Sequence, residues 1–189
     1  MVKLLFLAGS SRKDSVNKKL AQQAYKIAGD MKAEATFVDL KYYQMPIYDG
    51  DIEETSGIPE NAQKLKNIFA ANDGFFIASP EYNSSFSSLL KNSLDWISRP
   101  AEGEAPLIAF RNKVAALGAA SPGGLGGIRG LVPLRMMLGN IGVFVTPSQI
   151  AVGNAFKVFS QNGTLQDENS FKMLRTVIQE LVETASRIR

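Results

Sequence analysis

The chain of 189 residues contains neither cysteine nor histidine. The lack of cysteine excludes disulfides, thiolate nucleophiles, iron–sulfur clusters and thiolate metal sites. The lack of histidine excludes a Ser-His-Asp triad and most transition-metal sites. A redox reaction on this chain therefore needs a bound cofactor to carry the electrons.

Long apolar runs and basic stripes are also missing. No stretch approaches the ~20 apolar residues that a membrane-spanning helix requires. The apolar start of the chain ends at Gly9 and is followed by Arg12, Lys13 and Asp14, which favours a buried first strand over a signal peptide. The formal net charge is only +3, and the basic residues are scattered. We therefore expect a cytoplasmic protein with no nucleic-acid partner and no membrane partner.

What the chain does contain is an alternation of strand-length apolar runs with helical patterns. The apolar runs are residues 4–8, 36–38, 74–78, 114–120 and 143–146. The amphipathic patterns are residues 16–28, 62–69, 86–97, 127–139 and 171–185. Near-continuous apolar strands are typical of a parallel sheet that is buried on both faces. The pattern predicts a single α/β domain over residues 1–189, a doubly wound five-stranded parallel sheet with helices on both faces.

Three regions of this predicted fold are irregular. Pro133 lies inside the fourth helical pattern, where we expect it to kink the helix or delay its start. Residues 41–57 and 99–112 are longer than ordinary α/β connections, and such loops usually form site walls or interfaces. An acidic cluster at residues 49–54 is interpreted as a solvated surface rather than a metal site.

Ligands of doubly wound sheets bind beyond the carboxyl ends of the strands, where three loops of this chain are unusual. The first loop, residues 9–17, reads Gly-Ser-Ser-Arg-Lys-Asp-Ser-Val-Asn and leads into a helix, whose N-terminus favours an anion. It adds neutral donors and one cation suited to phosphate, namely Ser10, Ser15, Asn17 and Arg12. The spacing is neither that of a P-loop nor that of a dinucleotide fingerprint. The alternative is a plain helix cap formed by Asp14 or Ser15.

The second loop, residues 79–86, reads Ser-Pro-Glu-Tyr-Asn-Ser-Ser-Phe. Pro80 fixes a turn, after which Tyr82 and Asn83 could present a ring and an amide to a flat heterocycle such as an isoalloxazine. The alternative is a turn in which Tyr82 covers the core and Asn83 caps the next helix.

The third loop, residues 120–130, is rich in glycine, which lets backbone approach a flat ligand closely. Gly124 and Gly126 start like a dinucleotide motif, but Arg129 stands where the third glycine belongs, so we reject that interpretation. The alternative is a flexible loop before a helix.

Together these loops resemble the NADPH-dependent FMN reductase family, which includes bacterial chromate and quinone reductases. The family patterns G-S-x-R-x-x-S-x-N and S/T-P-E-Y-N are met by residues 9–17 and 79–83. Residues 45–51 and 94–100 are also similar to family segments, so the resemblance covers nearly the whole chain.

The resemblance implies a flavodoxin-like fold with strand order 2-1-3-4-5 and FMN as the cofactor. The cofactor's phosphate would lie against Ser10, Ser11, Arg12, Ser15, Val16 and Asn17. The flavin ring would lie against Pro80, Glu81, Tyr82 and Asn83, with Ser121, Gly123 and Gly124 on the other side. We further expect backbone N–H groups of residues 121–124 to stabilise charge on the flavin.

The activity implied by the resemblance is transfer of electrons from NADPH or NADH, through FMN, to a small-molecule acceptor. Quinones, chromate, azo compounds and free flavin are all candidate acceptors, and no side chain is needed as an acid or base. Family members usually form homodimers or homotetramers through the third helix, here residues 86–100. We expect Trp96 in that segment to belong to the core rather than to the interface.

Three rival functions remain open at this point. The chain could be a flavodoxin-type electron carrier, although Arg12 and the positive net charge count against it. It could be an FMN reductase that supplies reduced flavin to a partner monooxygenase. It could also be a flavin-free interaction module on the same fold.

Overall fold

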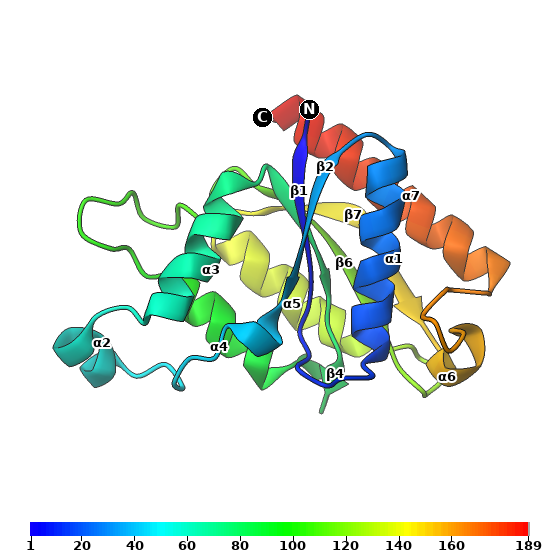
Figure 1. Cartoon of the computed structure of the whole chain (residues 1–189), viewed down its shortest axis with the longest axis horizontal. Helices are drawn as coiled ribbons and strands as arrows, with labels where there is room; N and C mark the ends of the chain where they lie inside the picture. The colour runs from blue at the N-terminus through cyan, green and yellow to red at the C-terminus, as the bar shows by residue number, and fades with distance from the viewer. Residues whose placement is uncertain (189) are drawn as a thin grey trace.

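A five-stranded parallel sheet forms the centre of the computed structural model, which describes residues 1–188 (Figure 1). The strands are β1 (Lys3–Ala8), β2 (Glu34–Asp39), β3 (Gly74–Ala78), β6 (Val114–Ala120) and β7 (Phe144–Val152). Their spatial order, β2-β1-β3-β6-β7, is the 2-1-3-4-5 order of flavodoxin-like folds, so the predicted fold class is confirmed. This order brings the carboxyl ends of β1 and β3 side by side.

Helices cover both faces of the sheet, because successive residues of a buried strand point to opposite sides. Phe6 and Phe76 pack on the face covered by α1 (Val16–Asp30) and α7 (Glu168–Ile188). Leu5 and Ile77 pack on the opposite face. That face is covered by α3 (Glu60–Ala71), α4 (Ser88–Ile97) and α5 (Ile128–Asn140).

Some expected boundaries are wrong, each for a local reason. Helix α5 begins at Ile128, so Pro133 does not delay its start; the hydrogen bond that Pro133 cannot donate would go to the carbonyl of Arg129, in the first turn of the helix. Strand β7 continues past Thr146 to Val152, since a proline such as Pro147 is tolerated on an edge strand.

Residue Phe86 belongs to a hairpin rather than to the helix in which it was expected. The hairpin consists of β4 (Glu81–Tyr82) and β5 (Ser85–Phe86). Asn83 and Ser84 connect the two strands with φ of 51° and 64°, the backbone of a two-residue turn with positive φ at both positions. Strands of two residues are too short to give a periodic signal, so the sequence pattern missed them.

The long segment after β2 contains the 3₁₀ helix η1 (Leu40–Tyr42) and α2 (Gly50–Ser56). It is fastened to α4, because the indole nitrogen of Trp96 donates to the carbonyl of Pro46 at 2.8 Å. Trp96 is fully buried, which confirms its expected place in the core. Glu53 accepts hydrogen bonds from Arg99 and from the Tyr48 hydroxyl, and the bond from Arg99 holds the pKa of Glu53 below its usual value.

The second long segment, residues 99–112, is held by an ion pair between the buried Lys66 and Glu104. The hydrogen bond from Lys66 lowers the pKa of Glu104. Among residues 1–188, no group of carboxylates is arranged to hold a metal ion. No helix in this part of the chain has both the length and the apolar character needed to cross a bilayer.

Candidate functional site

The β1–α1 loop ends in an open helix N-terminus. Ser15, not Asp14, is the N-cap residue, and its hydroxyl oxygen accepts from the N–H of Lys18 at 3.4 Å. The N–H groups of Val16 and Asn17 have no acceptor within residues 1–188. Free N–H groups at the positive end of a helix attract an anion.

Two serine hydroxyls of this loop keep a hydrogen available for a ligand. Ser10 and Ser15 are buried, and the hydroxyl oxygen of each accepts a backbone hydrogen bond, from Arg12 at 3.3 Å and from Lys18 at 3.4 Å. A hydroxyl that accepts in this way can still donate its own hydrogen. The Arg12 side chain is exposed and pairs with no carboxylate between residues 1 and 188. The loop therefore presents hydroxyl, amide and guanidinium donors together.

The Asn17 side chain joins two of the loops. It is buried; its carbonyl oxygen accepts from the N–H of Ala120, and its amide nitrogen donates to the carbonyl of Ala120, both at 2.9 Å. Only one amide hydrogen remains for a ligand. In the structure Asn17 thus fixes the start of α1 to the end of β6.

The hairpin β4–β5 positions the second group of expected residues. Tyr82 is about half exposed, with a relative accessible area of 52%. The Glu81 carboxylate is largely buried and accepts from the guanidinium of Arg129 at 2.8 Å. Helix α4 is capped by the hydroxyl of Ser87 rather than by Asn83, so the capping alternative is wrong.

The glycine-rich loop contains glycines of two kinds. Gly126 and Gly127 have φ of 64° and 86°, and a Cβ on Gly126 would lie 2.7 Å from the backbone of Ala151. The fold itself therefore requires these glycines. A Cβ on Gly123 would meet only Ser121, at 3.8 Å, and one on Gly124 would meet nothing within 4 Å. These two positions border open space, where a side chain would occupy room that a flat ligand could use.

The backbone donors of this loop are fewer than expected. The N–H of Ser121 donates to Val152 at 3.0 Å, and that of Gly123 donates to the Ser121 hydroxyl at 3.3 Å. Pro122 has no N–H. Within residues 121–124, only the N–H of Gly124 has no acceptor in the described chain. The expectation of several free donors is corrected to one.

The three loops meet in two connected spaces. The first, the α1 cavity, has a volume of about 110 Å³. It is lined by Ser10, Arg12, Asp14, Ser15, Val16, Asn17, Pro80, Glu81, Tyr82, Ala120, Ser121, Pro122 and Phe156. The second, the glycine-loop hollow, has about 450 Å³, includes Asn83, Gly123 and Gly124, and shares Glu81 and Ser121 with the first.

The structure thus brings together every expected site residue except Ser11, which is exposed and lines a different hollow beside Leu40 and Tyr43. Sequence reasoning missed Phe156, which comes from the four-residue helix α6 (Ala155–Val158) and carries no motif. It also missed the contact of Arg129 with Glu81, because the sequence pattern assigned Arg129 no role beyond standing where a dinucleotide motif has its third glycine.

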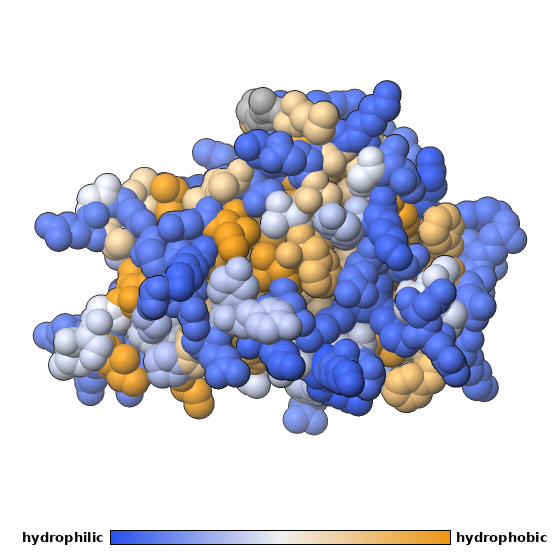
Figure 2. All heavy atoms as spheres, viewed as in Figure 1, coloured by the Kyte–Doolittle hydropathy of each residue, from blue (hydrophilic) through white to orange (hydrophobic). Residues whose placement is uncertain are grey.

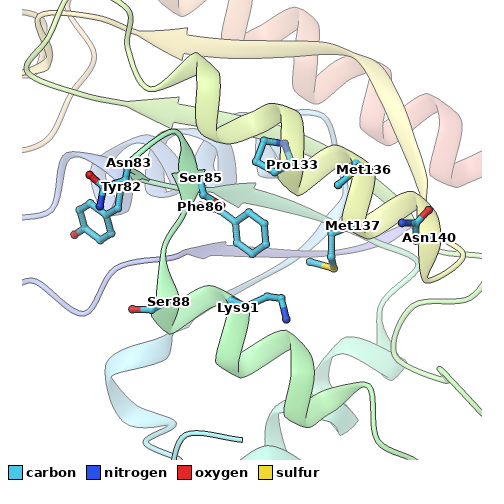
Figure 3. A pocket seen from close by; sticks show the side chains of 10 residues that line it. All are labelled: Tyr82, Asn83, Ser85, Phe86, Ser88, Lys91, Pro133, Met136, Met137 and Asn140. Carbon is cyan, nitrogen blue, oxygen red and sulfur yellow. The ribbon is translucent and has the colours of Figure 1, made fainter.

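An apolar hollow of about 670 Å³ lies beside the site, between the hairpin, α4 and α5 (Figure 3). Phe86 points into it from β5, and Pro133, Met136 and Met137 line it from α5. Tyr82 lines both this hollow and the α1 cavity.

The α1 cavity and the glycine-loop hollow fit a ligand with a phosphate at one end and a flat ring at the other. Buried hydroxyls and a helix N-terminus suit the phosphate, and an aromatic side chain with glycine backbone suits the ring. With the 2-1-3-4-5 sheet, these features define a flavodoxin-like protein of the flavin mononucleotide-binding class.

Comparison with known proteins gives the family. Residues 2–157 match the model of the NADPH-dependent FMN reductase family, and the chain belongs to this family. It is therefore an NAD(P)H-dependent oxidoreductase whose cofactor is FMN, as the resemblance implied.

Individual relatives cover almost the whole chain. An NAD(P)H:quinone oxidoreductase of Solanum tuberosum is 33% identical over 198 residues, covering 100% of this chain and 95% of the relative. An NADPH azoreductase of a Bacillus species is 31% identical, covering 95% of this chain and 90% of the relative. Among solved structures, the flavoenzyme NAD(P)H:acceptor oxidoreductase FerB of Paracoccus denitrificans superposes with a TM-score of 0.83 and 26% identity, covering 99% and 98% of the two chains.

Proposed function

We propose that this chain reduces quinones and similar small acceptors with electrons from NADPH or NADH, acting as a single FMN-binding domain over residues 1–189. The observation that carries the proposal is the meeting of three loops, distant in sequence, around one phosphate-to-ring site. When bound, FMN accepts two electrons from a nicotinamide and gives them to an acceptor. The acceptor class comes from relatives described as quinone oxidoreductases and an azoreductase.

The residues of the α1 cavity would hold the cofactor's phosphate. Ser10 and Ser15 would donate their hydroxyl hydrogens, and Arg12 would supply the positive charge. The N–H groups of Val16 and Asn17 would complete the cradle. Asn17 would act mainly by holding the cradle against β6.

The residues of the hairpin and the glycine loop would orient the ring. Pro80 and Tyr82 offer apolar contact, and Gly123 and Gly124 leave room for a close approach. The Gly124 N–H is the donor free to stabilise charge that develops on the ring. Glu81 is committed to Arg129, so this carboxylate positions the loop rather than transferring a proton. The chain would accelerate the reaction by holding the ring in a fixed position, so that the nicotinamide and, after it has left, the acceptor meet the same face of the ring in turn.

We also propose that the protein works as a homodimer or homotetramer in the cytoplasm. The apolar hollow beside α4 supports an assembly, because Tyr82 and Met136, which line it, are exposed. Sedimentation of the purified protein and of a Met136→Glu variant tests this; a monomer at all concentrations argues against it.

The main test is the visible spectrum of the purified protein during anaerobic addition of NADPH. We expect a flavin spectrum that NADPH bleaches and a quinone restores, without any added reductase. A flavin spectrum that NADPH cannot bleach would indicate a one-electron carrier. A protein that takes up no FMN even when FMN is supplied would contradict the proposal.

A further inference from the structure

A second polar hollow lies on the other side of the first turn of α1. We call it the lysine hollow; its volume is about 480 Å³. It shares Asp14 and Ser15 with the α1 cavity, so the two spaces are separated only by the N-terminal turn of the helix. The face of the molecule that carries α1 is largely hydrophilic (Figure 2).

Positive charge exceeds negative charge in this hollow. Four lysines line it, Lys13, Lys18, Lys19 and Lys41, against two carboxylates, Asp14 and Asp39. Asp39 is already used, because it accepts from the ammonium of Lys18 at 2.7 Å and from the N–H of Lys41 at 3.0 Å.

The remaining lysines keep donors available. Lys13 and Lys41 are exposed, and their ammonium groups form no ion pair with any residue from 1 to 188. Lys19 donates to the carbonyl of Ser160 at 3.3 Å, which leaves two of its three hydrogens. Three ammonium groups can therefore converge on an anion.

The rest of the wall suits a nucleoside. Tyr42 lines the hollow and has a relative accessible area of 74%, and an exposed aromatic ring can stack on a base. Gln22 and Gln161 add amides that can both donate and accept hydrogen bonds, as the edge of adenine requires. Asn162 adds an amide donor, because its carbonyl oxygen already accepts from Ser160 and Thr164.

We propose that the lysine hollow binds the 2′-phosphorylated adenosine end of NADPH and so makes the enzyme prefer NADPH to NADH. This inference rests on the proposed function, in which a dinucleotide places its nicotinamide over the ring. Its adenosine must then reach beyond the site, and the lysine hollow directly adjoins the phosphate end. The 2′-phosphate is the only chemical difference between the two dinucleotides, and a dianion gains most where unpaired ammonium groups gather.

The first experiment compares steady-state kinetics of the FMN-loaded parent with a Lys13→Gln, Lys41→Gln variant. We expect KM for NADPH to rise about 10- to 100-fold, because the variant loses hydrogen bonds to the charged 2′-phosphate. KM for NADH should be unchanged. Affinity for FMN should also be unchanged, because neither side chain lines the α1 cavity. A Lys64→Gln, Lys172→Gln variant removes the same charge from α3 and α7 and should behave like the parent.

The second experiment measures binding without turnover. Calorimetry with adenosine 2′,5′-bisphosphate should show binding that is at least tenfold tighter than that of 5′-AMP, and the lysine variant should lose this difference. Equal binding of the two nucleotides by the parent would overturn the inference, as would a variant that keeps the NADPH preference.

Failure of the inference can be told from failure of the proposed function. If the parent binds FMN and turns over NADPH but the variant has the same KM for NADPH, the lysine assignment fails and the reductase function stands. If the protein takes up no FMN, the reductase function fails, and the bisphosphate titration still tests the hollow.

Discussion

The α1 cavity and the lysine hollow lie on opposite sides of one helix turn and offer different kinds of hydrogen-bond donors. The α1 cavity offers buried hydroxyls and backbone N–H groups that the fold holds in place, together with the exposed guanidinium of Arg12. The lysine hollow relies on long side chains, two of which are exposed and unpaired within residues 1–188. Fixed donors suit a cofactor that stays bound, whereas flexible ammonium groups suit a substrate that arrives and leaves in every turnover.

Because of this contrast, we expect FMN binding in the α1 cavity to depend on the positions of the donors, and dinucleotide binding in the lysine hollow to depend on charge. Removing a single fixed donor from the α1 cavity should weaken FMN binding strongly, because the remaining donors cannot move to replace it. Removing a single lysine from the hollow should have a smaller effect, since its neighbours can reach the same anion.

The largest effect is expected for Arg12→Ala. Arg12 supplies the only guanidinium among the residues from 1 to 188 that line the α1 cavity; its loss would remove a charge-assisted hydrogen bond, and FMN affinity should fall about 10- to 100-fold. Fluorescence titration of the flavin-free protein measures it. Riboflavin, which lacks the phosphate, is the control and should bind the parent and the variant equally. An equal loss of affinity for riboflavin would contradict the assignment of Arg12 to the phosphate.

The next effect concerns stability rather than binding. Asn17→Ala leaves the N–H and carbonyl of Ala120 without their partner, at a cost of about 1–3 kcal/mol. The melting temperature should drop by roughly 3–10 °C for a chain of this size. Lys41→Gln, in the lysine hollow, is the matched comparison and should stay within about 0.5 kcal/mol of the parent. An unchanged melting temperature for Asn17→Ala would show that the two loops are held by other contacts.

A smaller effect is expected at the ring end of the site. Gly124→Val should weaken FMN and riboflavin equally, by about fivefold, because the new side chain occupies space beside the ring. Stability should not change, since a Cβ there meets nothing. Gly126→Val provides the contrast and should unfold more easily, because its φ is positive and its Cβ would meet the backbone of Ala151. Unaltered flavin affinity in Gly124→Val would remove this loop from the ring site.

The smallest effect is that of salt. Raising potassium chloride from 0.05 to 0.5 M should increase KM for NADPH about three- to fivefold, because exposed charges are screened over a few ångströms at that concentration. The dissociation constant of FMN should change less, since the buried hydroxyls of Ser10 and Ser15 are screened less by salt than exposed ammonium groups are. Steady-state kinetics give KM for NADPH and flavin titration gives the dissociation constant of FMN, both at the same salt concentrations. If salt raises the two constants by the same factor, the proposed difference between the two spaces is wrong.

Local sequence was sufficient for much of this protein. The apolar runs predicted all five strands of the sheet because buried parallel strands are apolar on both faces. The two loop motifs contain nine of the thirteen residues that line the α1 cavity, and six of these come from the first loop, because a phosphate at a helix N-terminus needs its donors within one short segment. The short hairpin at Asn83 was missed, since two-residue strands give no periodic signal. The helical pattern of residues 127–139 did predict α5, and only the delayed start that Pro133 could have caused is absent.

The sequence by itself thus determined the sheet, the family and most of the segments that line the α1 cavity. Only the tertiary structure decided what joins those segments and what lies beside them. Asn17 and Ala120 are 103 residues apart, and their hydrogen bonds exist because the 2-1-3-4-5 order brings α1 against the end of β6. The lysine hollow likewise draws on α1, η1 and the loop after α6. Side chains from such distant segments share no motif, and they form a site only because the packed sheet fixes the elements that carry them.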